Sequence, residues 1–112
     1  MKTYSDTRKR LEKSILHWRR IVKGKRKPGE WHYTEDCALC EKFLIKECKG
    51  CPVAVKTGQI MCLGSPWINV EASFKYGLKK TKNYEAAYSF PDVRQKAQEM
   101  LDFLISLRKN TP

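Results

Sequence analysis

The chain has 112 residues, 41% of them hydrophobic, which predicts a single domain with one modest core and argues against global disorder. Its net charge is +11, and residues 1–30 hold eleven Lys or Arg against three acidic residues. This basic stretch has no apolar run behind it, so we expect neither a secretory signal nor a membrane span, and a cytoplasmic protein. The positive charge favours nucleic acid or an acidic protein as the partner. We expect no membrane partner and no small-molecule substrate.

A long amphipathic helix is predicted from Thr3 to about Val22. Its apolar side chains recur at spacings of seven, four, three and four residues, which places them on one buried stripe. His17 lies on the side of this helix, and we expect its imidazole at the surface. The apolar stripe consists of Tyr4, Leu11, Ile15, Trp18 and Val22.

Cations collect on the opposite side of this helix and continue into the loop, where Gly24 and Pro28 end the helix. One interpretation is a solvated face on a core-packed helix, followed by an extended, mobile connector. The other is a surface that neutralises phosphates, with one apolar contact among the cations. The candidate nucleic-acid or partner-binding residues are Lys9, Lys13, Leu16, Arg19, Arg20, Lys23, Lys25, Arg26 and Lys27.

The middle section, residues 31–65, contains all five cysteines and little periodicity. We expect knuckles and turns there, with a short helix around residues 39–44 and a small hairpin. The odd number of cysteines in a short segment fits a disulfide framework poorly and fits thiolate metal ligands better.

Two C-x2-C pairs carry the chemistry of this section, Cys37 with Cys40 and Cys48 with Cys51. Two residues between ligands allow a tight turn to aim both sulfurs at one ion, and Gly50 suits a turn that needs a positive φ. Four thiolates would complete a closed tetrahedral site. The pairs therefore predict a structural zinc site of these four cysteines.

Other ligand sets and other metals stay open. Cys62 follows Cys51 by eleven positions and His32 precedes Cys37 by five, so either could replace one of the four. The competing thiolate set replaces Cys48 with Cys62. An iron–sulfur cluster is the weaker metal alternative, since Cys51-Pro52 is similar to a ferredoxin ending but the spacing differs. The sequence contains neither H-x-E with P-C-x-x-C, the signature of zinc deaminases, nor H-E-x-x-H, the zinc motif of metalloproteases. We therefore expect that the protein is not an enzyme.

Three further helices are predicted after the cysteines. Ser65 followed by Pro66 is typical of a helix start, and this helix should end near Lys80. Asn83 is a candidate cap for a short helix over residues 84–88. The last helix is predicted over residues 91–108, and its apolar face carries Val93, Ala97, Met100, Leu101, Leu104 and Leu107.

The chain also resembles small cysteine-rich proteins of bacteriophages and bacteria. The resemblance covers most of the chain and consists of His17-Trp18, the two cysteine pairs with Pro52-Val53, Thr57-Gly58, Cys62 with Pro66-Trp67, and the segment 100–107. It implies a phage-encoded protein, a class that commonly regulates transcription or disables host machinery. The resemblance also implies that Cys62 belongs to the cysteine pattern of these proteins.

The sequence thus predicts a mostly α-helical single domain over residues 1–112. A zinc-stapled cysteine-knuckle module at 31–65 lies between a basic helix with its linker at 1–30 and a helical region at 66–112. The leading function is a zinc-stabilised, nucleic-acid-associated regulatory protein. The alternative is a phage-type inhibitor or adaptor that binds a host protein, such as a defence or nucleic-acid enzyme.

Overall fold

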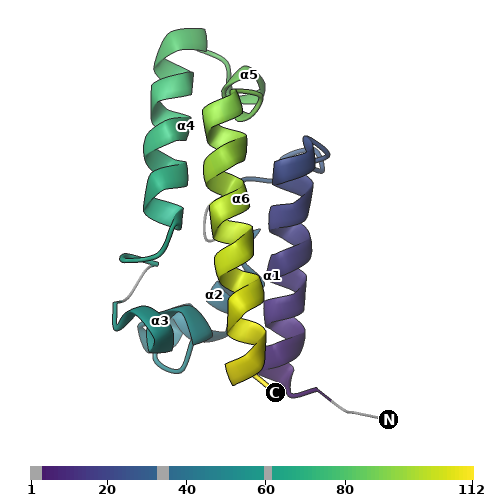
Figure 1. Ribbon diagram of the computed structural model, residues 1–112, viewed down its shortest axis with the longest axis vertical. Helices are drawn as coiled ribbons and strands as arrows, with labels where there is room; N and C mark the ends of the chain where they lie inside the picture. Colours follow the sequence, from purple (N-terminus) through teal and green to yellow (C-terminus); the bar gives the residue numbers. More distant parts are fainter. Residues whose placement is uncertain (1–3, 33–35, 60–61) are drawn as a thin grey trace.

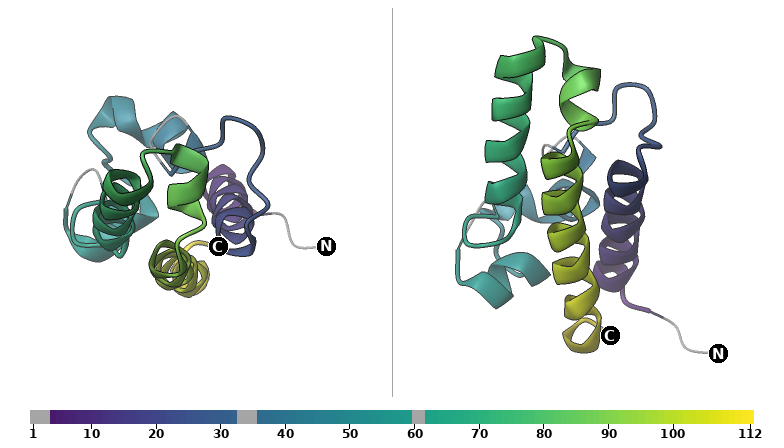
Figure 2. Two further views of the ribbon diagram at one scale, coloured as in Figure 1. Left: turned by 90° about the horizontal axis from the view of Figure 1, so that it is seen from above. Right: turned by 45° about the horizontal axis from the view of Figure 1, so that its top comes forward.

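The computed structural model describes residues 4–32, 36–59 and 62–112, and these residues form helices and turns without any strand. Three long helices form one layer in which α6 lies between α1 and α4 and runs antiparallel to both (Figure 1). The shorter elements of the cysteine segment lie across one face of this layer, as the view from above shows (Figure 2). The elements are α1 (Asp6–Lys23), α2 (Ala38–Phe43), η2 (Leu44–Lys46), α3 (Pro52–Thr57), α4 (Trp67–Thr81), α5 (Tyr84–Tyr88), α6 (Pro91–Ser106) and η3 (Leu107–Asn110).

Helix α1 is the predicted amphipathic helix. It begins after Ser5, whose hydroxyl accepts a hydrogen bond from the Arg8 amide, and it ends at Gly24 in the left-handed conformation. The predicted start at Thr3 lies outside the described residues. Val22 is partly buried against the core, as predicted, and Ile21 is buried as well, because a position three residues after Trp18 also returns to the buried face. Tyr4 is exposed, against prediction, and Arg8 covers its ring.

The C-terminal helix follows its predicted pattern closely. All six residues of its predicted apolar face are buried, and the helix tightens into η3 for its last turn. Arg108 in η3 makes two hydrogen bonds to Glu12 of α1, at 2.7 and 2.8 Å. This ion pair joins the first helix, α1, to the last helical turn, η3.

Helices α4 and α5 form the corner that leads into α6. Ser65 stands at the predicted helix start, where its hydroxyl accepts from the Trp67 amide at 3.2 Å. Asn83 caps α5 as predicted, through a 3.0 Å hydrogen bond from the Ala86 amide. Gly77 is buried at this corner against Phe90.

The cysteine segment is more helical than we predicted. The small hairpin is wrong for the described residues, because α2, η2 and α3 occupy this segment in its place. Cys37 and Cys51 each precede the first turn of a short helix, and Pro52 favours the first helical position of α3. The short helix predicted around residues 39–44 corresponds to α2 and the start of η2. Helix α2 packs on α1, and α3 packs on η3.

None of the helices in the described parts of the chain combines the length and the apolar character needed to cross a membrane.

Candidate metal centre and basic surface

All five cysteines line a single cavity of about 280 Å³. Side chains of α1 and α6 close the cavity opposite the cysteine segment, among them Trp18, Met100 and Leu104. Segments that are far apart in the sequence thus bring both C-x2-C pairs and Cys62 to one place. Within residues 4–32, 36–59 and 62–112, however, no group of three or more His, Cys, Asp or Glu side chains is arranged to hold a metal ion. The structure therefore gathers the predicted donors without distinguishing between the two thiolate sets.

Cys37 and Cys40 form a closely coupled pair at the start of α2. The Cys40 amide donates to the Cys37 sulfur at 3.2 Å, so the Cys37 side chain caps this helix. The Cys40 thiol, together with the backbone amides of Cys40 and Leu39, lowers the pKa of Cys37 against the opposing effect of burial. The same interaction raises the pKa of Cys40. Cys37 is therefore the thiol of this pair that ionises first.

The other three cysteines are Cys48, Cys51 and Cys62, and two of them have an unusual backbone conformation. Burial raises the pKa of Cys51, and it raises that of Cys62 to about 12. Cys48 and Cys62 have φ values of 65° and 61°, in the left-handed region that residues other than glycine rarely occupy. Gly50 has a φ of 90°, so the turn between Cys48 and Cys51 does use the positive φ that we expected at this glycine.

His32, a predicted alternative ligand, has hydrogen-bond contacts at both ring nitrogens. Its Nδ1 lies 2.6 Å from the Tyr88 hydroxyl and its Nε2 lies 3.2 Å from the Glu71 carboxylate. The ring is buried, which lowers the pKa of His32, and it also lines the thiol cavity. Both nitrogens are thus held by other groups.

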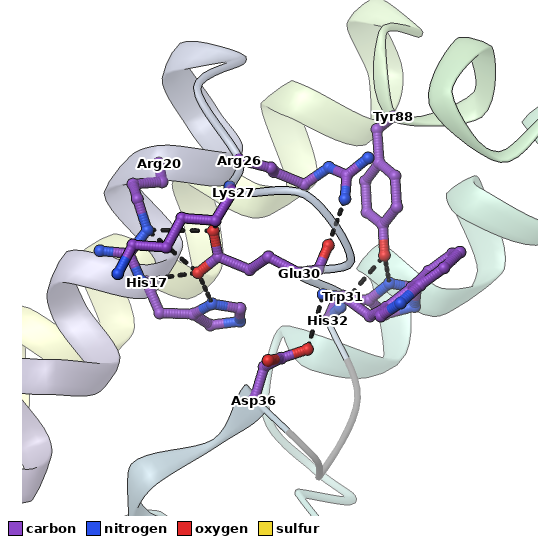
Figure 3. A network of polar contacts seen from close by, with 9 residues as sticks. All are labelled: His17, Arg20, Arg26, Lys27, Glu30, Trp31, His32, Asp36 and Tyr88. Carbon is purple, nitrogen blue, oxygen red and sulfur yellow. Dashed lines mark hydrogen bonds and ion pairs between the residues drawn. The ribbon is translucent and has the colours of Figure 1, made fainter.

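A buried ion network around Glu30 is the main feature that sequence reasoning missed (Figure 3). The Glu30 carboxylate lies 2.6 Å from His17 Nδ1 and 2.6 Å from Arg20 Nη2, and it accepts from the Lys27 amide at 2.8 Å. Burial alone would raise the pKa of Glu30, but hydrogen bonds from Arg20, His17 and Lys27 lower it to about 2. The prediction of a surface imidazole at His17 is wrong, because its side chain is buried against this carboxylate.

Two of the predicted partner-binding cations are engaged within the molecule. Arg20 pairs with Glu30. Arg26 is almost completely buried, donates to the Glu30 carbonyl and the Glu85 carboxylate, and lies over the Tyr88 ring. The loop after α1 is therefore folded around Glu30 and is not the extended connector that we expected.

The remaining predicted contacts face outward. Leu16 is 52% exposed, and Arg19 is half-buried on the flank of α1. The outward stripe of α1 consists of Lys9, Lys13, Leu16 and Lys23, whose spacings of four, three and seven residues put them on one face of the helix. The exposed cations are Lys9, Lys13, Lys23, Lys25 and Lys27.

Comparisons of this chain with models of protein families, with curated proteins and with solved structures found no match.

Proposed function

We propose that the protein is a zinc-stabilised, nucleic-acid-associated regulatory protein of the phage type. The cysteine cavity would hold one structural zinc, and the outward stripe of α1 with the following loop would contact phosphates. The observation that carries the zinc part is the convergence of five thiols on one cavity, because sulfur is the donor that structural zinc sites favour.

Backbone strain at two cysteines supports a ligand role for this cluster. A left-handed conformation costs a residue with a side chain about 1–2 kcal/mol, and Cys48 and Cys62 both adopt it. Such conformations persist where the surrounding structure over-determines them, and they cluster at functional sites. Zinc coordination would supply a compensating interaction at either position.

The ligand set is Cys37, Cys40, Cys48 and Cys51, with Cys62 as the alternative to Cys48. Single variants separate the two sets, because Cys48→Ala would release zinc under the first set and Cys62→Ala under the second. Zinc content is measured by elemental analysis after gel filtration. Retention by Cys48→Ala together with loss by Cys62→Ala would move the assignment to the second set.

Nucleic-acid contact is proposed from the outward stripe of α1. Lys9, Lys13 and Lys23 are exposed on it over 14 positions, about 21 Å of helix, and the exposed loop lysines extend the surface. Arg20 and Arg26 contribute little to this surface, since acidic partners inside the molecule hold them. The five exposed lysines and Arg19 supply six cations, and we expect four or five of them to contact phosphates.

The test is a titration of duplex and single-stranded DNA and RNA at 50 and 200 mM salt. Four or five phosphate contacts predict that affinity falls about a hundredfold between these concentrations. The variant Lys13→Glu with Lys23→Glu should weaken binding to all sequences alike. The matched control, Lys75→Glu with Lys79→Glu, makes the same charge change at exposed positions of α4. Binding no tighter than about 100 μM at the lower salt would reject nucleic acid as the partner.

A host protein is the second candidate partner, favoured by Leu16. This apolar side chain is half exposed in the middle of the cationic stripe, where phosphate binding does not need it. An acidic protein surface with an apolar pocket would use both features. Such a partner would remain bound after nuclease treatment and would be lost in Leu16→Ser.

A further inference from the structure

His17 presents an imidazole to the cavity that the thiols line. The residue is 3% exposed and lines the cavity, and its Nδ1 lies 2.6 Å from the Glu30 carboxylate. Figure 3 shows the second ring nitrogen on the side of the ring away from Glu30. Among the described residues Nε2 has no hydrogen-bond partner, so it is the nitrogen left for another ligand.

The hydrogen bonds around Glu30 decide which nitrogen carries the hydrogen. Arg20 donates to both carboxylate oxygens, and the Lys27 amide donates to one of them. A carboxylate surrounded by donors acts as an acceptor, so the hydrogen of the His17 contact lies on Nδ1. A neutral ring in this tautomer has its lone pair on Nε2. Metal-binding histidines commonly have this arrangement, in which a carboxylate holds one nitrogen and the metal takes the other.

A second buried group on the same helix points to the same place. Ser14 lies one turn before His17, lines the cavity and is 3% exposed, and its hydroxyl has no hydrogen-bond partner among the described residues. It is close to the Cys37 thiol, although without the geometry of a hydrogen bond. Helix α2 is held against α1 there, where Arg10 donates to the Ala38 carbonyl at 3.0 Å. A thiolate bound to a metal at Cys37 would give the Ser14 hydroxyl an acceptor.

We propose that His17 Nε2 is one of the zinc ligands, giving a Cys3His site in which Glu30 is the positioning residue. The inference rests on the proposed zinc site and changes its composition, because one imidazole replaces one thiolate of the predicted quartet. Cys37 and Cys40 are the thiols on the helix that packs against α1, and the third thiolate comes from the segment 48–62. His32 is not the nitrogen donor, since Tyr88 and Glu71 hold its two nitrogens.

Zinc-edge X-ray absorption of the wild-type, zinc-loaded protein tests this assignment without any substitution. A Cys3His site predicts three sulfurs at about 2.3 Å and one nitrogen at about 2.0–2.1 Å. Four sulfurs with no nitrogen would overturn the role of His17 and leave the zinc site itself in place. A protein that binds no zinc would instead remove the proposed site, and the role of His17 with it.

The source of the nitrogen is tested with the chain's two histidines. His17→Ala should lose the nitrogen shell and bind zinc at least about 100-fold more weakly, measured by competition with a chelator, because loss of an outer-shell partner alone typically costs about 10- to 100-fold. His32→Ala should keep the nitrogen shell. Should His17→Ala fail to fold, His32→Ala alone decides, because loss of the nitrogen there would make His32 the ligand and overturn the assignment.

Discussion

The guanidinium carbon of Arg26 lies 3.8 Å from the centroid of the Tyr88 ring, which joins the loop after α1 to helix α5. The same side chain donates to the Glu30 carbonyl and to the Glu85 carboxylate. A cation that is 6% exposed and held in this way stabilises the fold and is not available to a partner.

Arg26→Ala should therefore lower the free energy of unfolding by about 2–3 kcal/mol, because a desolvated cation–π contact and charged hydrogen bonds are lost. The neighbouring exposed residue provides the control, since Lys25→Ala should change stability by less than about 0.5 kcal/mol. Urea unfolding followed by circular dichroism measures both. Equal stability of the two variants would contradict the structural role of Arg26.

Glu12 should make stability depend on pH. Hydrogen bonds from Arg108 and then Arg8, opposed by burial, lower its pKa from 4.5 to about 2. A lowered folded-state pKa means that the stabilisation is present above about pH 4.5 and is lost as the pH falls towards 2. Because both carboxylate and guanidinium are about one-third exposed, we expect a contribution of about 1–2 kcal/mol.

The measurement compares wild type with Glu12→Gln in urea at several pH values between 2 and 7. The variant should be less stable at pH 7, and the difference should shrink towards zero near pH 2. Glu30 also titrates in this range, but it is present in both proteins and cancels in the comparison. A difference that does not change with pH would contradict the ion pair with Arg108.

Gly77 allows α4 to approach Phe90 closely. A Cβ at this position would lie 2.9 Å from Phe90 Cδ2 and 3.4 Å from the Ala87 carbonyl oxygen. Gly77→Ala gains up to about 1 kcal/mol of helix propensity but should lose more through overpacking, about 1–3 kcal/mol. Thermal unfolding should show a net decrease in melting temperature, and adding Phe90→Leu should recover part of it. A more stable single variant would show that the corner can expand without cost.

The long helices could be predicted from the sequence because their apolar residues recur with the helical period. The short helix over residues 84–88 could be predicted from the cap at Asn83. Helix α3 could not, since six residues give too little periodicity and its start depends on Cys51 and Pro52.

The surroundings of His17 and Glu30 could not be predicted either. Glu30 is the sole acidic residue between positions 13 and 34, and this isolation among cations was the available signal. Which cations it holds depends on how the loop folds back on α1, and a helical wheel does not contain that information. Arg20 and Arg26 consequently looked like surface charges. The cysteine spacing, in contrast, predicted donors for one ion, and all five thiols do line one cavity.

The metal content of the purified protein tests the central claim most directly. Elemental analysis of protein expressed without added metal, after gel filtration, should find about one zinc per chain and no iron, with no visible absorption band. Removing the metal with a chelator should lower the melting temperature, because the cysteine segment has little core of its own. A protein without zinc, or one with two or more irons per chain and a brown colour, would contradict the account.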